Sequence, residues 1–289
     1  MQDYIMAEIM LEAGLPPDVF NLVTGTGQEV GAALSSHSQV DMISFTGSIR
    51  AGIEIAKAAA PTVKRVTQEL GGKSPFIITE QADLAAAVIC GVEDVMLNTG
   101  QTCSALTRML VPQSRYQEAL ALAKAHVETL QCGTNGDAFM GPACSQKQQQ
   151  QILDYIRIGL KEGASLLCGG TEAPEGVDKG YYVAPTIFSD VNNSMRIARE
   201  EIFGPVLCIL PYETIEQAIE IANDTPYGLS SGVYAEDEAT ALEIAGYIRA
   251  GLCFINGGYK QSGNGREFSL QGVMEFMETK AIKRPLPTK

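Results

Sequence analysis

Short apolar runs alternate with longer segments of helical periodicity along most of this chain. The runs at 40–45, 74–79 and 108–112 have the length and apolar character of buried strands. Segments such as 82–97 and 145–162 have the length and pattern of helices. Strands that alternate with helices favour parallel pairing, because a parallel connection crosses the sheet through a helix. The sequence therefore predicts an α/β fold with mostly parallel sheets.

The first 30 residues add two expectations of their own. Apolar residues at helical spacing predict a helix over 2–13, which Gly14 and the following prolines end. The run VFNLV at 19–23 then predicts a buried strand. A turn and a helix are expected from residue 25 onward.

Charge and hydropathy exclude several classes of function. The formal net charge is −13 and the pI is near 4.7, so the surface repels phosphate backbones and anionic lipid. We expect neither a nucleic-acid partner nor a membrane partner. The longest apolar runs are too short to span a bilayer, and the acidic N-terminus does not resemble a secretory signal.

The cysteines and histidines argue against disulfides and metal sites. Seven cysteines are scattered without a CxxC pair, and the two histidines lie far apart in the sequence. A metal site and a Ser–His–Asp triad are therefore not expected. A reducing, cytoplasmic setting suits this pattern.

Cys103 is the candidate nucleophile. It lies in NTGQTCSALTRMLV (98–111), after a long predicted helix and just before a predicted strand. Gly100 permits a tight turn, and small polar neighbours leave room for a substrate. A free cysteine is usually a small buried hydrophobe, and we interpret Cys90, Cys168 and Cys208 in that way, as well as Cys253.

Glu69 is the candidate proton-transfer group. In QELGGKSP (68–75) it ends a predicted strand and is followed by a double glycine, which lets two backbones or a ligand approach closely. Position alone leaves the alternative open that Glu69 is a solvated acid at a strand end.

Three further motifs are weak when taken singly. In ISFTGSIRAG (43–52) a strand leads into a helix whose first N–H groups would attract phosphate. GTGQEVG (25–31) has its third glycine one residue late for a dinucleotide fingerprint, so we discount it. REEIFGPV (199–206) by itself indicates only a charged helix end.

Taken together and in order, these motifs resemble the aldehyde dehydrogenase family. The series is FTGS, ELGGK, GQTC, EEIFGPV and GGYKQSGNGRE, with Glu69 lying 34 residues before Cys103. The resemblance implies a partial Rossmann-type nucleotide-binding domain followed by an α/β catalytic domain. We expect the first over 1–71 and the second over 72–265. Residues 266–289 would form a return segment and an oligomerisation strand, which implies a homo-oligomer.

The resemblance also implies a reaction. Cys103 would attack an aldehyde as a thiolate, its own backbone N–H would stabilise the oxyanion, and hydride transfer to NAD or NADP would leave a thioester. Glu69 would activate the water that releases the carboxylic acid. The residues implied in cofactor binding are Gly47, Ser48, Gly52, Leu70, Gln148, Glu201 and Phe203.

The sequence departs from the family in two places. The chain begins at a helix that resembles one in the middle of the family's nucleotide-binding domain, so the segment with an oxyanion-hole asparagine is expected to be missing. Asn256 runs directly into Gly257, where family members have a substrate-tunnel loop. These departures keep two alternatives open: a catalytically weak or inactive remnant, and a cofactor-independent esterase that uses Cys103. The motifs distinguish neither the aldehyde nor NAD from NADP.

Overall fold

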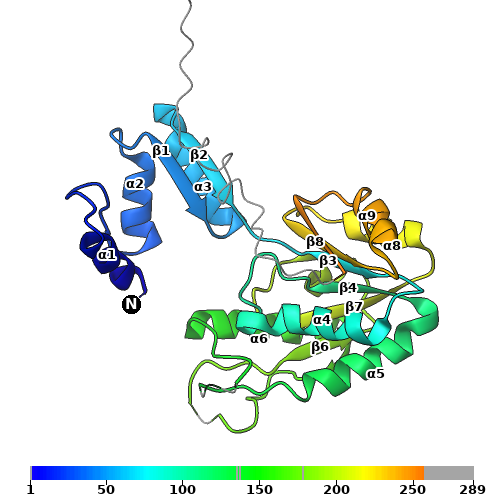
Figure 1. Ribbon diagram of the computed structural model, residues 1–289. Helices are drawn as coiled ribbons and strands as arrows, with labels where there is room; N and C mark the ends of the chain where they lie inside the picture. Colours follow the sequence, from blue (N-terminus) through cyan, green and yellow to red (C-terminus); the bar gives the residue numbers. More distant parts are fainter. Residues whose placement is uncertain (1, 135, 137, 178, 257–289) are drawn as a thin grey trace, which may run out of the picture. The chain divides into compact units, whose positions relative to one another are not determined.

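A computed structural model describes residues 2–134, 136, 138–177 and 179–256 as two compact units (Figure 1). The first unit is Met1–Leu70, and the second begins at Gly71. The return segment expected at 266–289 lies outside the described residues. No helix in the described part of the chain is long and apolar enough to cross a bilayer.

The first unit is built around one β–α–β crossover. Strands β1 and β2 pair in parallel, from Met42 opposite Arg65 to Thr46 opposite Glu69. Its elements are α1 (Gln2–Glu12), a π-helical turn (Gly27–Gly31), α2 (Ala32–Ser36), β1 (Met42–Thr46), α3 (Ile49–Ala59), a 3₁₀ turn (Ala60–Thr62) and β2 (Arg65–Glu69). The predicted helix over 2–13 and the strands on either side of α3 are confirmed.

The buried strand expected at 19–23 is wrong. These residues form an irregular segment in which Val19 and Val23 are 65% and 60% exposed. The sheet of this unit contains β1 and β2, and no strand among the described residues pairs with 19–23. A strand needs a neighbour to satisfy its backbone N–H and C=O groups, so apolar composition alone does not make one.

The second unit contains a seven-stranded sheet in the order β5-β6-β7-β4-β3-β8-β9. Neighbouring strands are parallel except for β5 and β6, which are antiparallel, so the predicted α/β fold with mostly parallel pairing is confirmed. The strands are β3 (Pro75–Ile78), β4 (Arg108–Pro112), β5 (Ser165–Cys168), β6 (Thr186–Ser189), β7 (Val206–Tyr212), β8 (Ser230–Tyr234) and β9 (Leu252–Ile255).

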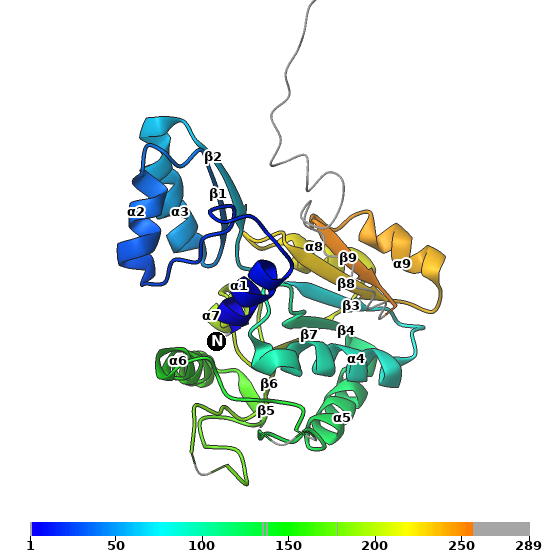
Figure 2. The ribbon, with the colours of Figure 1, turned by 60° about the vertical axis from the view of Figure 1, so that its left-hand side comes forward.

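Helices cover both faces of this sheet, as Figures 1 and 2 show. Successive strand residues point to opposite faces, so Phe76 and Ile78 pack against α4 and α5 while Ile77 belongs to the core of the other face. The helices are α4 (Leu84–Met96), α5 (Tyr116–Val127), α6 (Gln146–Glu162), α7 (Arg196–Arg199), α8 (Ile215–Asn223) and α9 (Glu238–Ala245). Burial on both faces explains why the interior strands β3 and β7 are largely apolar.

The loops that lead into β3, β4, β7 and β8 meet at one edge of the sheet. Because these strands are parallel neighbours, their amino ends lie at the same edge. Cys103 lies in the loop before β4, and Glu201 lies in the loop before β7. Ligands of open parallel sheets usually bind at the carboxyl ends of the strands. The candidate residues of this sheet lie instead at the amino ends.

Candidate active site

The turn before Cys103 has a strained backbone. Asn98, Thr99 and Gly100 follow one another with φ of 51°, 60° and 66°, which is the left-handed region. That conformation is unfavourable for threonine, whose β-branch crowds the backbone. The Thr99 hydroxyl donates to the Gly141 carbonyl at 2.9 Å, which ties the turn to a neighbouring loop.

Gln101 adds a second tie to the same loop. Its side-chain oxygen accepts the backbone N–H of Cys144 at 2.8 Å, and its amide donates to the Asn98 carbonyl at 3.1 Å. The Gln101 side chain therefore links the left-handed turn to the loop that contains Cys144. In the sequence, Gln101 is visible only as part of GQTC, and nothing there indicates this bracing role.

The segment after Cys103 is held from two sides. The Leu106 N–H donates to a carboxylate oxygen of Asp94 on α4 at 2.6 Å, in a buried position. The Ser230 hydroxyl donates to the Ser104 carbonyl at 2.7 Å and lies 2.7 Å from the Ser74 hydroxyl. Cys103 itself is half-buried. The thiol thus sits between a turn that is tied to the loop at 141–144 and a segment that is anchored to α4 and to the sheet.

The double glycine of ELGGK contacts both the nucleophile loop and Glu201. A β-carbon at Gly72 would lie 2.5 Å from the Cys103 carbonyl oxygen, and one at Gly71 would overlap the Glu201 carboxylate. The Gly72 N–H donates to Oε1 of Glu201 at 3.2 Å, across 129 residues of sequence. Only glycine at both positions allows the backbone to pass this closely.

Glu201 is held in a half-buried position. Its backbone N–H donates to the Tyr227 hydroxyl at 3.3 Å. Burial raises the pKa of its carboxyl group, while the hydrogen bond from Gly72 and the charge of Lys73 act in the opposite direction. The ionised form is therefore stabilised by a donor and a cation against the effect of desolvation.

The turn after Glu201 is fixed by Gln148 on the first turn of α6. The Gln148 amide donates to the carbonyls of Ile202 and Phe203 at 3.2 and 2.8 Å. Phe203 is itself left-handed, with φ of 56°. The Ser145 hydroxyl caps α6 by accepting the Gln148 N–H at 3.1 Å. Gln148 therefore acts on the backbone of EEIFGPV.

In the first unit, the predicted residues gather at the carboxyl ends of β1 and β2. The Gly47 N–H donates to the Glu69 carbonyl at 3.0 Å, which extends the ladder of the two strands. Ser48 caps α3, its hydroxyl accepting the Ala51 N–H at 3.3 Å. Gly52 is buried because α3 packs closely on β2, where a β-carbon would lie 2.8 Å from Leu70.

Burial affects several of the other cysteines. All seven cysteines are free of disulfides. Burial raises the pKa values of Cys90 and Cys168 to about 11, which keeps both thiols protonated and poorly nucleophilic at neutral pH. Burial also raises the pKa of Cys208, which is fully enclosed in the sheet. Cys208 therefore fits the interpretation as a small buried hydrophobe, whereas Cys90 and Cys168 are only half-buried.

Sequence and structure comparisons agree on one family. The model of the aldehyde dehydrogenase family matches residues 1–282. A 3-succinoylsemialdehyde-pyridine dehydrogenase of a Pseudomonas species is 50% identical over 291 residues, which cover 96% of this chain and 61% of that protein. The chain thus spans about three fifths of the length of the curated relatives that it matches.

Solved structures match equally well. Aldehyde dehydrogenase C of Pseudomonas syringae, in a complex with NAD⁺ and octanal, superposes with a TM-score of 0.92 at 50% identity, over 97% of this chain and 60% of that one. The Mycobacterium tuberculosis aldehyde dehydrogenase in complex with NAD⁺ gives a TM-score of 0.91 at 42% identity, over 99% of this chain and 61% of that one. The α/β fold agrees with these matches. The chain belongs to the aldehyde dehydrogenase family.

Proposed function

We propose that this chain carries the nucleophile, the general base and part of the cofactor site of an NAD(P)-dependent dehydrogenase that oxidises an aldehyde to a carboxylic acid. The observation that carries the proposal is the clamped loop around Cys103, which the Gly71–Gly72 pair joins to Glu201. Family membership and the NAD⁺ complexes of similar structures support the same reaction. The substrate class is a small-molecule aldehyde.

Cys103 is the proposed nucleophile. Its thiolate adds to the carbonyl carbon, a C–S bond forms, and the carbonyl electron pair moves to oxygen to give a thiohemiacetal. The backbone N–H of Cys103 is the donor proposed for that oxyanion. The anchored flanks of the loop hold this N–H and the thiol in one geometry, which is what a preorganised oxyanion site needs.

Glu69 is the proposed base. Three peptide units separate it from Gly72, so its Cα stays within roughly 11 Å of the Gly72 Cα. Gly72 in turn lies against the Cys103 carbonyl. Glu69 would remove a proton from water as that water attacks the thioester. The C–S bond then breaks, which releases the carboxylic acid and returns the thiolate.

The residues that would hold the dinucleotide offer suitable donors and acceptors. The first turn of α3, capped by Ser48 after Gly47, presents backbone N–H groups to a pyrophosphate. Gly52 and Leu70 shape the packing of α3 on β2 beside it. The Glu201 carboxylate, with Phe203 beside it, would accept from the hydroxyls of the nicotinamide ribose. Gln148 keeps its carboxamide oxygen for a further ribose hydroxyl. The bound nicotinamide would supply the acceptor for the hydride that leaves the thiohemiacetal carbon.

The test is NADH formation by the purified 289-residue chain with NAD and a short aliphatic aldehyde. We expect turnover that is abolished in Cys103→Ala and retained in Cys144→Ala, which removes an exposed thiol from a nearby loop. Glu69→Gln should form NADH in a burst of about one equivalent and then stop, because acylation precedes the water step. Absence of NADH formation by the folded, soluble chain contradicts the proposal and favours an inactive remnant.

The same preparation distinguishes the esterase alternative. Hydrolysis of an activated ester needs the Cys103 thiolate and a water-activating base but no hydride acceptor. Cys103-dependent ester hydrolysis without NAD, combined with no NADH formation, would identify that activity instead. The proposal also includes a cytoplasmic location, which the seven free thiols support. It further includes assembly into a homo-oligomer.

A further inference from the structure

Lys73, the last residue of ELGGK, is a deeply buried cation next to the site, and the proposed function does not use it. Its side chain is 1% exposed, and its Nζ makes no hydrogen bond to any residue that the structure describes. Its carbonyl accepts the Nε–H of Arg108 at 3.0 Å, which fixes the backbone at this point. An enclosed ammonium without a hydrogen-bond partner is costly, and such groups are concentrated at functional sites.

The titratable and charged groups that face Lys73 come from three elements. They are Cys208 on β7, Arg108 on β4, and Glu200 and Glu201 in the loop before β7. Burial lowers the pKa of the Lys73 ammonium, Arg108 lowers it further, and the other three raise it. The thiol of Cys208 is kept protonated by burial, so the two carboxylates are the available counter-charges.

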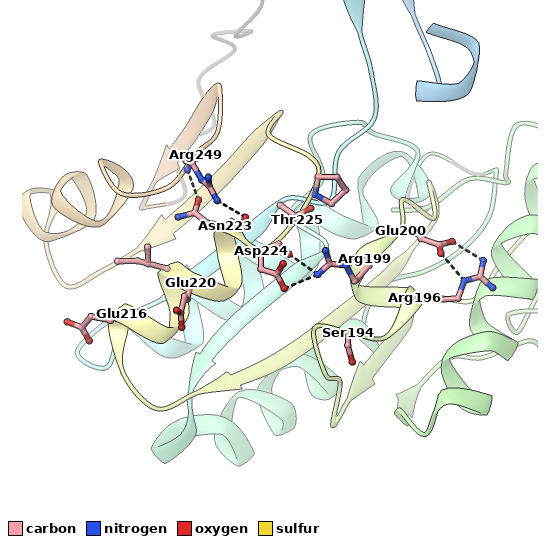
Figure 3. A pocket seen from close by; sticks show the side chains of 12 residues that line it. Ser194, Arg196, Arg199, Glu200, Glu216, Glu220, Asn223, Asp224, Thr225 and Arg249 are labelled. Atoms are coloured by element: carbon pink, nitrogen blue, oxygen red, sulfur yellow. Dashed lines mark hydrogen bonds and ion pairs between the residues drawn. The ribbon is translucent and has the colours of Figure 1, made fainter. Parts of the chain in front are cut away.

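Other partners already engage Glu200. It receives two hydrogen bonds from the Arg196 guanidinium, at 2.8 and 2.9 Å, and one from the Tyr155 hydroxyl at 2.7 Å. Figure 3 shows Glu200 turned toward Arg196 at the rim of a polar surface hollow. Arg108 is likewise engaged, by the Asn193 side chain and by the carbonyls at the end of α8.

Glu201 is the remaining carboxylate, and it is bound to the residue beside Lys73. It accepts the Gly72 N–H at 3.2 Å, and its half-buried carboxyl group has a pKa that burial raises and that Lys73 lowers. Tyr227, whose hydroxyl accepts the Glu201 N–H, is the other titratable group at this position, and burial raises the pKa of that phenol. Lys73 is therefore the cation that opposes the effect of burial on Glu201.

We propose that Lys73 is a positioning residue whose buried ammonium keeps the Glu201 carboxylate ionised near neutral pH, so that this carboxylate can accept the ribose hydroxyls of the cofactor. The inference rests on the proposed function for the identity of the ligand. The electrostatic link between Lys73 and Glu201 does not depend on that identity. Lys73 acts through Glu201.

The first experiment is a ¹³C-carboxyl NMR titration of Glu201, assigned by the loss of its signal in Glu201→Gln. We expect Lys73→Met to raise the Glu201 midpoint by about one pH unit, which is the usual effect of losing one nearby opposite charge. Lys161→Met, which removes a cation near the end of α6, is the control and should leave the midpoint unchanged. An unchanged midpoint in folded Lys73→Met overturns the inference.

A reciprocal measurement keeps the test decisive if Lys73→Met fails to fold. In Glu201→Gln, the ¹³Cε titration of Lys73 should move to lower pH, because the carboxylate that stabilises the ammonium has been removed. An unmoved Lys73 midpoint overturns the inference. A packing role for Lys73 would move neither titration.

Cofactor binding separates this inference from the proposed function. With the full chain and NAD as the probe, Lys73→Met should bind NAD as tightly as the wild type at pH 8. Its affinity for NAD should then fall progressively as the pH is lowered to 6. A wild-type chain that binds no NAD contradicts the proposed function. In that case a Glu201 midpoint that still moves in Lys73→Met upholds the link between the two side chains.

Discussion

The backbones of Gly100 and Gly204 lie in direct contact, so that a β-carbon at Gly100 would overlap the Gly204 carbonyl group. The contact joins the left-handed turn before Cys103 to the turn that follows Glu201 and Phe203. The thiol and the carboxylate thus belong to two loops that cannot move independently where they touch. The candidate residues of the second unit are therefore linked through their backbones, and a change at a linking residue should affect all of them.

Gly100→Ala should disrupt this contact. The added methyl group meets backbone atoms, which cannot rotate away, and it also enters a left-handed residue with φ of 66°. We expect the free energy of unfolding to fall by about 2–4 kcal/mol, from overpacking together with the left-handed conformation. Urea denaturation measures the change. Gly141→Ala is the control, because a β-carbon there meets no atom within 4 Å and should change stability little. Equal effects of the two variants would contradict the role of the contact.

Gln148→Ala should loosen the turn that carries Glu201 and Phe203. The substitution removes the donor for two backbone carbonyls, so the turn gains freedom and the cofactor should bind about tenfold more weakly, equivalent to about 1.4 kcal/mol. The run of glutamines supplies a matched control. Gln151 lies on the same helix and is exposed, so Gln151→Ala should bind NAD as the wild type does. Calorimetric titration with NAD compares the three proteins.

Asp94 should prove important for stability although it lies outside the recognised motifs, on the helix that precedes GQTC. Asp94→Ala leaves the buried Leu106 N–H without its acceptor, and we expect a loss of about 1–3 kcal/mol in the free energy of unfolding. Asp94→Asn keeps an acceptor oxygen and should lose less. Denaturant unfolding of both variants provides the test, and a larger loss for asparagine than for alanine would show that the Leu106 hydrogen bond is not the cause.

Stability should depend on pH through Glu201. Burial raises the pKa of this carboxyl group, so folding favours its protonated form. That contribution is complete below the ordinary carboxyl pKa and is lost as pH rises through the raised value. Glu201→Gln mimics the protonated form at every pH. The variant should therefore match the wild type near pH 4 and exceed its melting temperature at pH 7–8, while binding NAD more weakly. A wild-type protein that is the more stable of the two at pH 8 would contradict this assignment.

Local patterns in the sequence were sufficient to predict many of the helices and strands and to identify the family. The spacing of apolar residues located β1, α3, β2 and, in the second unit, β3, α4, β4 and α6, because side-chain periodicity is set by backbone geometry. The motif around Cys103 and the ELGGK segment pointed to the candidate chemistry only through their resemblance to the family, because position alone left the role of Glu69 open. The strand expected at 19–23 is wrong because local composition carries no information about whether a pairing partner is present.

Tertiary structure decided which residues surround the motifs. Sheet order placed the loops before β3, β4 and β7 side by side, and only then do Gly72 and Glu201 meet across 129 residues. The bracing by Gln101, the anchor at Asp94 and the enclosure of Lys73 also follow from that order. Hydrogen bonds and burial depend on atoms brought within a few ångströms by the whole fold. The amino-acid sequence by itself therefore determined the family and named the candidate reacting groups, while tertiary packing decided which residues hold those groups in place.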